Sequence, residues 1–327
     1  MGFVIAGIIL GALILFYISC FIANHFVSKN VYGRRGDSSI SIKYEMPSDF
    51  KNLDIKKDYF LNNKKARLTT FEYKAKGNDN PKGILLLSHG IGGGHLYLLP
   101  LINYLCERGL IVLAYDQYGS GTSEGKRIYS MTQGAIDIKY AVRYVEAHYD
   151  LPFYVMGHSW GGFCAANSLR YSKKILKCVD IAGMDSESSM TSGPAFFATI
   201  ATLFIKLCGS SIYGKYGLYT SYGAFKKTKA KVLYLQGKQD LTVPPKKNGF
   251  RYEKKFKNKE NITVMMLDNK GHSPIVTYES QLGQSQVMAQ FGMLCKNLVP
   301  LDVYVDFNKN NVPDMDVYKL IGDYLLD

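Results

Sequence analysis

A serine flanked by glycines is the residue of this sequence whose setting most clearly suggests chemistry. The stretch Gly157-His158-Ser159-Trp160-Gly161 fits the pattern G-x-S-x-G and directly follows the apolar run FYVM. In this pattern the serine sits on a strained turn from a strand into a helix, and the glycines remove side chains that would clash across it. Ser159 is therefore predicted to be a nucleophile. The alternative, a serine in an ordinary strand-to-helix turn, is disfavoured by the apolar strand before it and the helical stretch after it.

A serine hydroxyl is a weak nucleophile at neutral pH, so the prediction requires a histidine base and an acid that orients it. Asp240 follows the apolar run VLYLQG, within GKQDLTVP, and His272 follows TVMML, within NKGHSP. His272 is the only one of six histidines that comes after both Ser159 and Asp240. The chain order Ser, Asp, His is the usual order after such a serine turn.

Other aspartates could take the role of the acid. Asp180 and Asp185 flank the preceding strand, and Asp268 is close to His272 in sequence, where it suits a structural turn. Asp240 is favoured because it lies at the carboxyl end of a predicted strand, where the sites of open α/β sheets form.

The attack of Ser159 on a carbonyl would also need hydrogen-bond donors for the oxyanion. The glycine-rich stretch SHGIGGGH, residues 88–95, follows the run ILLL. We assign the backbone N–H groups of Ile91 and of Trp160, at a helix N-terminus, as the donors. His89 and His158 are expected to pack and form hydrogen bonds. A phosphate-binding loop is the alternative, but GxGxxG spacing and a Walker lysine are missing, and no zinc-ligand spacing is present.

Short runs that are apolar throughout alternate with helical stretches from Gly83 onward. This alternation predicts a mostly parallel α/β sheet flanked by helices, with strands covered on both faces. The predicted strands are GILLLSHG, LIVLAYD, FYVMGHS, KCVDIAG, KVLYLQG and NITVMMLD, and the predicted helices span Leu96–Arg108, Met131–His148 and Trp160–Tyr171. Before them, SIKYEM and ARLTTFEYKAK are expected to form an antiparallel hairpin at a sheet edge.

Four motifs in order, HGIGGG, AYDQYGSGTSEG, GHSWGG and GKQDLTVP with GHSP, resemble the α/β-hydrolase superfamily. The resemblance covers roughly Gly83 to Asp327 and is strongest to the branch of serine esterases and lipases with monoacylglycerol lipases, lysophospholipases and serine aminopeptidase-like hydrolases. It implies an α/β-hydrolase fold with an inserted cap and no cofactor or metal. It also implies that Asp116, Gly119, Gly121 and Ser123 of the second motif shape the loop beside the site. His89, Gly90, Gly157 and Gly161, in the first and third motifs, are expected to be structural near the site.

Two segments depart from the family pattern. Residues 185–228 interrupt the sheet before KVLYLQG, where the family inserts its cap, and their AFFATIATLFIKLC stretch could line an acyl pocket or pack as a buried helix. The second departure is the long segment from Pro274 to Val305. Asp306–Asn310 nearby resembles a calcium loop but lacks the glycine and the closing glutamate of an EF-hand, which favours a turn.

The N-terminus carries an uncharged apolar run from Phe3 to Ala23, long enough to span a bilayer as a helix. We expect a membrane anchor over residues 1–23, a polar linker over 24–40 and a hydrolase domain over 41–327. A cleaved signal peptide is the rival, but no Lys or Arg precedes the run and no clear cleavage pattern follows it. Cys20 is a poor lipidation site, and Ala6 excludes a myristoylation pattern.

Charge and cysteine usage bear on partners and location. The formal net charge of +13 comes from dispersed lysines without a nucleic-acid motif, so no nucleic-acid partner is expected; a basic face near anionic lipids or a solvated surface accounts for it. Basic residues follow the apolar run, which favours a cytoplasmic domain; they are Lys29, Arg34, Arg35 and Lys43. The cysteines after the run show no CxxC or metal spacing, and most are expected to be small buried hydrophobes; they are Cys106, Cys164, Cys178, Cys208 and Cys295.

Two classes of function fit these observations. The first is a serine hydrolase that cleaves carboxylic esters, with a lipid-like or acyl-glycerol ester favoured by the apolar cap and the expected anchor. An aminopeptidase, amidase or thioesterase of the same fold is the alternative within this class. The second is a non-catalytic member of the fold that binds a ligand or partner. The presence of all three triad residues favours the hydrolase.

Overall fold

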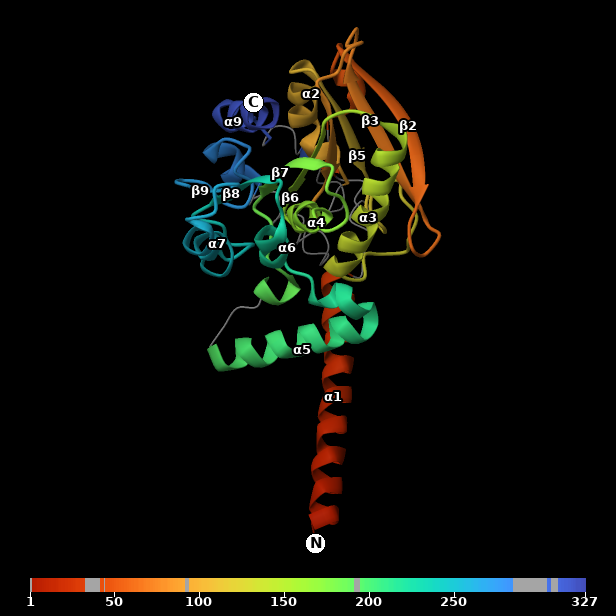
Figure 1. Cartoon of the computed structure of the whole chain (residues 1–327), viewed down its shortest axis with the longest axis vertical. Helices are drawn as coiled ribbons and strands as arrows, with labels where there is room; N and C mark the ends of the chain where they lie inside the picture. Colours follow the sequence, from red (N-terminus) through yellow and green to blue (C-terminus); the bar gives the residue numbers. More distant parts are fainter. Residues whose placement is uncertain are drawn as a thin grey trace.

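The centre of the molecule is an eight-stranded sheet with helices on both faces, from which one long helix projects (Figure 1). The computed structural model describes residues 2–32, 42–43, 45–91, 94–190, 195–284, 305–306 and 311–327. The strands are β1 Ile42–Lys43, β2 Leu53–Leu61, β3 Arg67–Ala75, β4 Gly83–Ser88, β5 Leu110–Tyr115, β6 Phe153–His158, β7 Ile175–Ile181, β8 Lys231–Gly237, β9 Ile262–Leu267 and β10 Val305–Asp306.

Helices fill the connections between these strands. The α-helices are α1 Gly2–Tyr32, α2 Leu99–Glu107, α3 Met131–His148, α4 Trp160–Ser168, α5 Ala195–Tyr213, α6 Ser221–Lys227, α7 Gly249–Phe256 and α9 Met315–Leu326. Short 3₁₀ turns lie at η1 Pro47–Asp49, η2 Leu96–Leu98, η3 Glu187–Met190, η4 Gly214–Leu218 and η5 Pro245–Lys247.

The strand order in the large sheet is β2-β3-β5-β4-β6-β7-β8-β9. Strands β5, β4, β6, β7, β8 and β9 pair in parallel, whereas β3 is antiparallel to both of its neighbours. The carboxyl ends of the parallel strands therefore lie at one edge of the sheet, where the loops after β4, β6, β8 and β9 converge. This arrangement confirms the mostly parallel sheet that the sequence predicts.

Alternation along β4 shows how the sheet buries both of its faces. Ile84 and Leu86 join a core cluster with α3, α4, α6 and α7, and Leu85 and Leu87 join a second cluster with α2 and α9. All four side chains are fully buried. A strand covered on both faces must be apolar at every position, which is the pattern that identified it in the sequence.

The helices largely agree with expectation. The bounds of α3 match the expected helix, and Ser130 begins it by accepting a hydrogen bond from the Thr132 N–H. The helix expected to reach Tyr171 ends earlier, because α4 stops at Ser168.

The expected edge hairpin exists, but with a different first strand. β2 pairs antiparallel with β3 from Leu53 opposite Ala75 to Leu61 opposite Arg67. The SIKYEM segment contributes only β1, which pairs in parallel with β10 in a separate two-stranded sheet. The prediction missed β2 because most of this edge strand is exposed on both faces, so its lysines and aspartates hide any alternation.

The cap lies between β7 and β8, where the sequence predicts an insertion, and consists of η3, α5, η4 and α6. Figure 1 shows α5 running below the sheet and across α1. Residues 191–194 at its start lie outside the described part of the chain. Residues 285–304 and 307–310 do as well, so most of the Pro274–Val305 segment and of the possible calcium loop is not described.

The projecting helix α1 is longer than the expected span. It continues past Ala23 to Tyr32, so the first part of the expected linker is helical. The window Gly2–Ser19 has a mean hydropathy of 2.4, and none of it is buried against the rest of the protein. By length and composition this helix could cross a membrane, and a signal sequence has the same properties.

Candidate active site

The turn between β6 and α4 holds Ser159 in a backbone conformation that few residues adopt. Ser159 has φ 57° and ψ −118°, a strained combination for a residue with a side chain. Its N–H donates to the carbonyl of Ile181 at 2.8 Å, which ties the turn to β7.

The neighbouring glycines are required by close backbone contacts. A Cβ on Gly157 would lie 2.0 Å from the carbonyl oxygen of Gly161, and a Cβ on Gly161 would lie 1.9 Å from that of Ser88. The glycines of the G-x-S-x-G pattern therefore let the turn pass against the end of β4.

The structure brings Ser159, His272 and Asp240 together at the carboxyl ends of β6, β9 and β8. His272 Nε2 lies 2.9 Å from Ser159 Oγ, and His272 Nδ1 lies 3.0 Å from Asp240 Oδ2. The carboxylate can only accept, so Nδ1 carries the proton and donates to Asp240. The lone pair of Nε2 then faces the serine hydroxyl and can take its proton.

Asp240 is held as an anion by donors on every side. Its Oδ1 accepts from the N–H groups of Thr242 and Val243, both at 2.8 Å, and its Oδ2 also accepts from Gln236 Nε2 at 3.1 Å. Burial by itself raises the pKa of this carboxyl, but the hydrogen bond and charge of His272 and the other donors outweigh it, and the pKa of Asp240 lies below its ordinary value.

Two of the rival aspartates are buried in other contacts. Asp180 accepts from the Gly183 N–H at 2.9 Å beneath the turn, and burial raises its pKa well above the ordinary value. Asp185 binds Arg251 at 2.9 Å and Tyr252 at 3.0 Å, and so joins the cap to α7.

The third rival, Asp268, is exposed and pairs with Lys238 at 2.9 Å. Within the described residues, none of the rival aspartates forms a hydrogen bond to His272. The acid beside His272 is therefore Asp240.

The loop after β4 lies directly against Ser159. A Cβ on Gly90 would be 3.2 Å from Ser159 Cβ, which places the Ile91 backbone next to the serine. Within the described parts of the chain, no acceptor is recorded for the N–H groups of Ile91 and Trp160. Gly92 and Gly93 lie outside those parts. The indole of Trp160 is fully buried and donates to the Met131 carbonyl at 2.8 Å.

A chain of hydrogen bonds joins this loop to the histidine. The Gly90 N–H donates to the Tyr97 hydroxyl at 2.7 Å, and that hydroxyl lies 3.0 Å from His158 Nδ1. His158 Nε2 lies 2.9 Å from the carbonyl oxygen of His272, to which it must donate. Nδ1 of a neutral His158 is then an acceptor, and Tyr97 donates to it.

His158 must be neutral for this chain to form. Burial, and after it the neighbouring His272, lower the pKa of His158 to about 3. The sequence singled out His158 as a hydrogen-bonding residue but gave no sign of Tyr97, because no motif includes it.

Two further histidines stabilise the loops around the site. His89 Nε2 accepts from the Gln117 N–H at 3.0 Å, so its Nδ1 donates to the Gly90 carbonyl at 2.6 Å. His95 Nδ1 lies 2.8 Å from Asp116 Oδ1. Burial opposes ionisation of Asp116, but the hydrogen bond and charge of His95 outweigh it and lower the pKa of Asp116 to about 2.

Asp116 also fixes the second glycine-rich loop. Its Oδ2 accepts from the Thr122 N–H at 2.9 Å, and a Cβ on Gly121 would lie 2.1 Å from the same oxygen. Asp116 therefore joins the loop after β4 to the loop after β5.

An open cavity of about 340 Å³ lies beside His272. Its described lining has no carboxylate and consists of Gln239, Leu241, Thr242, Gly271, His272, Ser273, Gln281 and Gln284. Leu241 is almost fully exposed at its edge. The described residues contain no group of three or more His, Cys, Asp or Glu that could hold a metal ion.

Known proteins resemble this chain over its central part. Residues 79–214 match the family model described as serine aminopeptidase S33; this range includes Ser159, and Asp240 and His272 follow it. A proline iminopeptidase of Saccharolobus solfataricus is 30% identical over 118 residues, which are 35% of this chain and 36% of that protein. Human monoglyceride lipase is 34% identical over 98 residues, 28% of this chain and 31% of the lipase. The chain thus matches about a third of each curated relative's length.

A solved structure with the same fold covers more of the molecule. An esterase of Pyrococcus furiosus superposes with a TM-score of 0.55 at 17% identity, over 80% of this chain and 96% of the esterase. At this identity the likeness establishes the fold. Together with the match of residues 79–214 to the serine aminopeptidase S33 model, it shows that this chain has the α/β-hydrolase fold and is similar to that family over its central part.

Proposed function

We propose that the protein is a serine hydrolase that cleaves carboxylic esters through an acyl-enzyme. The observation that carries this proposal is the continuous contact from Ser159 through His272 to Asp240, at 2.9 and 3.0 Å. The strained turn that presents Ser159 supports the same assignment, because such strain persists where the surrounding structure enforces it.

The geometry supports the following steps. Ser159 Oγ attacks the substrate carbonyl while His272 Nε2 accepts the hydroxyl proton, and Asp240 stabilises the imidazolium that forms. The N–H groups of Ile91 and Trp160 donate to the oxyanion. His272 then protonates the leaving alcohol, and water, activated by the same histidine, releases the acid and restores Ser159.

An ester fits the described surroundings better than a peptide with a free amino terminus. An aminopeptidase must hold the cationic amine of its substrate, and no carboxylate is present in the described lining of the cavity beside His272. The likeness to human monoglyceride lipase supports an acyl ester, whereas the likeness to proline iminopeptidases supports an aminopeptidase as the second candidate. Amide or thioester hydrolysis would use the same three residues.

We also propose that α1 is an uncleaved membrane anchor and that the hydrolase domain faces the cytoplasm. Support comes from the exposed apolar surface of α1 and from the basic residues Lys29, Arg34, Arg35 and Lys43 that follow the span. The full chain should stay in membranes after carbonate extraction. A mature N-terminus beyond Ala23 would contradict the anchor, and digestion of the domain by protease added to intact cells would contradict the orientation.

Substrate profiling of the purified full-length protein tests the activity. We expect hydrolysis of short p-nitrophenyl esters and of monoacylglycerols or lysophospholipids, and much slower release of naphthylamine from proline naphthylamide. A preference for the proline amide would replace the esterase by the aminopeptidase. No turnover of any of these by folded protein would favour a binding function.

A further inference from the structure

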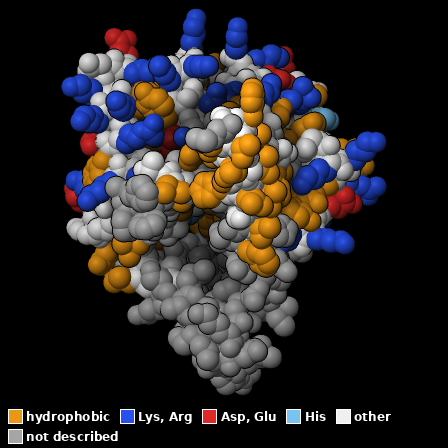
Figure 2. All heavy atoms as spheres, turned by 90° about the horizontal axis from the view of Figure 1, so that it is seen from below, with side chains coloured by type: hydrophobic (Ala, Val, Ile, Leu, Met, Phe, Trp, Pro, Cys, Tyr) orange, Lys and Arg blue, Asp and Glu red, His pale blue; other side chains and the backbone are white. Residues whose placement is uncertain are grey.

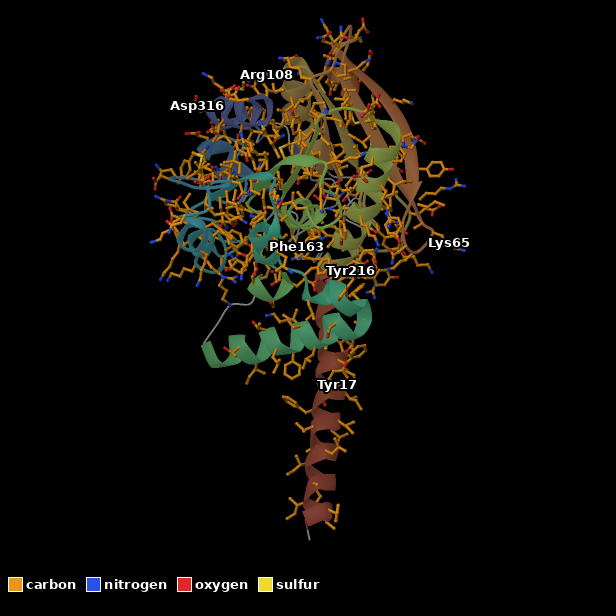
Figure 3. The ribbon with its side chains drawn as sticks, viewed as in Figure 1. Tyr17, Lys65, Arg108, Phe163, Tyr216 and Asp316 are labelled. Carbon is orange, nitrogen blue, oxygen red and sulfur yellow. The ribbon has the colours of Figure 1, made fainter. Side chains whose placement is uncertain are left out.

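The cap helix α5 lies against the helix that we propose as the anchor. The rings of Phe16 on α1 and Phe204 on α5 meet edge to face with their centres 5.0 Å apart. The hydroxyls of Tyr17 and Ser211 are 2.5 Å apart. Figure 1 shows α5 running across α1 at a steep angle, and Figure 3 shows Tyr17 on α1 just below the crossing.

The crossing point lies close to the domain end of the apolar span. At 1.5 Å rise per residue, Tyr17 is about 3 Å from the end of the window at Ser19 and about 9 Å from Ala23. If α1 crosses the bilayer, α5 is therefore at the level where head groups meet acyl chains. In-plane helices lie about 5–10 Å deep in this boundary.

The side of α5 that faces away from the domain is apolar. Leu203 and Leu207, one helical turn apart, are 56% and 41% exposed, whereas Cys208 is fully buried. Lys206 is the only charged residue of α5.

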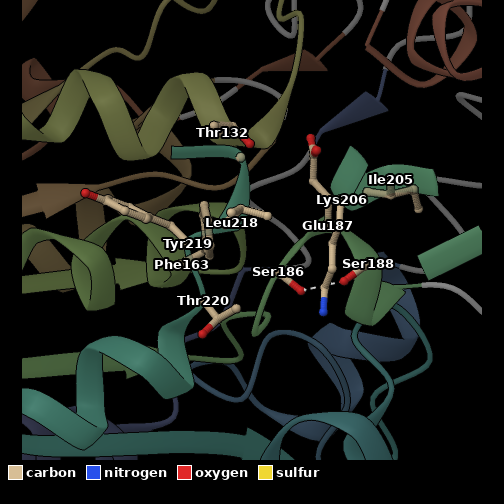
Figure 4. Close-up of a pocket in the computed structure, with 11 residues that line it drawn as sticks. Thr132, Phe163, Ser186, Glu187, Ser188, Ile205, Lys206, Leu218, Tyr219 and Thr220 are labelled. Carbon is tan, nitrogen blue, oxygen red and sulfur yellow. Dashed lines mark hydrogen bonds between the residues drawn. The ribbon is translucent and has the colours of Figure 1, made fainter. Parts of the chain in front are cut away.

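Lys206 lines a small cavity on the domain side, together with Glu187, Phe163 and Tyr219 (Figure 4). Lys206 is itself exposed three residues after Leu203, so the two leucines form a stripe with this one lysine at its flank, next to the apolar surface of α1. Seen from the side of α1, hydrophobic side chains gather toward the middle of the face, and Lys and Arg lie along its upper and lateral edges (Figure 2).

We propose that α5 lies in the plane of the bilayer, with Leu203 and Leu207 inserted among the lipids, so that the cap rests on the membrane surface. The proposal rests on the anchoring role proposed for α1. The apolar surface of α1 would run along the membrane normal and the exposed leucines of α5 would lie across it, and two such adjacent surfaces fit a bilayer. The alternative is that a second copy of the chain covers this apolar surface, and the experiments below distinguish a second copy from lipid.

Tryptophan quenching by lipids tests the insertion in the full-length protein. The variants Leu203→Trp and Leu207→Trp are reconstituted in vesicles whose phosphatidylcholine carries bromine on the upper acyl chain. Trp160, the only native tryptophan, is buried in all variants, and its emission is subtracted using the wild type.

The matched control is Leu176→Trp. Leu176 is 50% exposed near the start of β7, at the opposite end of that strand from the cap. We expect the variants on α5 to lose added emission in brominated vesicles, because their indoles lie at acyl-chain depth, and Leu176→Trp to lose none. Equal emission in brominated and ordinary vesicles, with the protein resistant to carbonate extraction, would overturn the proposal while leaving the anchor intact.

A charged double variant, Leu203→Glu with Leu207→Glu, tests the consequence for activity. Its turnover of a monoacylglycerol in vesicles should fall roughly tenfold, equivalent to 1.4 kcal/mol of lost lipid contact, while turnover of a short water-soluble ester is unchanged. If the wild type itself did not hydrolyse the short water-soluble ester, the proposed hydrolase activity would be contradicted instead. Equal vesicle activity in both proteins, or a dimer of the wild type in detergent that the double variant abolishes, would overturn the proposed lipid contact.

Discussion

Replacing Asp240 by Asn tests how the acid acts on His272. Asp240 Oδ1 accepts from two backbone N–H groups, so the amide oxygen of an asparagine must take this place. The amide NH₂ group then faces His272 Nδ1, which must become an acceptor. The ring proton moves to Nε2, where it faces Ser159 and blocks transfer of the hydroxyl proton.

The structure gives the asparagine side chain no favourable orientation in which its amide oxygen and nitrogen are exchanged. The same NH₂ group would also face Gln236 Nε2, and Gln236 cannot turn because its Oε1 accepts from Tyr234 and Gly249 and its Nε2 donates to Val243. Two donors facing each other should cost about 1–3 kcal/mol of stability. The wrong tautomer should lower kcat about 10⁴-fold, which corresponds to about 5.4 kcal/mol in the barrier.

Ester turnover and urea unfolding of the same preparation separate the two effects. Asp268→Asn is the matched control, because Asp268 is exposed and pairs only with Lys238 among the described residues; it should behave as the wild type. Near-normal kcat in folded Asp240→Asn, with a large loss in Asp180→Asn or Asp185→Asn, would refute this assignment of the acid.

Three further perturbations address the loop and the buried histidine. Ile91→Pro removes one oxyanion donor and should lower kcat about 10²–10³-fold, whereas Ile91→Val should keep much activity; normal kcat in the proline variant would place the donor elsewhere. Tyr97→Phe breaks the link from Gly90 to His158 and should lower kcat more than it changes KM, and an unchanged kcat would show that the link positions nothing. The pKa of His158 lies far below that of an unfolded histidine, so its contribution to stability should be full above pH 6.5 and fall as the pH drops toward 3, by about 2 kcal/mol at pH 5. The measurement is the urea midpoint of the wild type and of His158→Asn as a function of pH. The same pH dependence in both proteins would contradict a neutral buried His158.

The parallel strands and the three residues at the site could be predicted because each has a local signal. Strands such as β4 are buried at every position and carry an apolar run, here Ile84 to Leu87, since helices cover both faces. Ser159 is marked by glycines whose side chains would collide with the backbone. His272 follows from the order of motifs along the chain.

The features that were missed depend on contacts between distant segments. β2 lies at the sheet edge, where exposure removes the alternation that identifies a strand. Tyr97 gains its role only because the loop after β4 folds back onto His158. Likewise, the sequence shows two apolar helices, but only the folded chain shows that α5 crosses α1.

Covalent labelling of Ser159 tests the central claim most directly. A fluorophosphonate probe should modify the full-length wild type once, and peptide mass mapping should place the adduct on Ser159. Ser159→Ala should remain unlabelled although it is folded. Ser189 is a buried serine of the cap, and the control variant Ser189→Ala should be labelled as the wild type is. Equal labelling of the wild type and Ser159→Ala, or an adduct mapped to another residue, would contradict the proposed nucleophile.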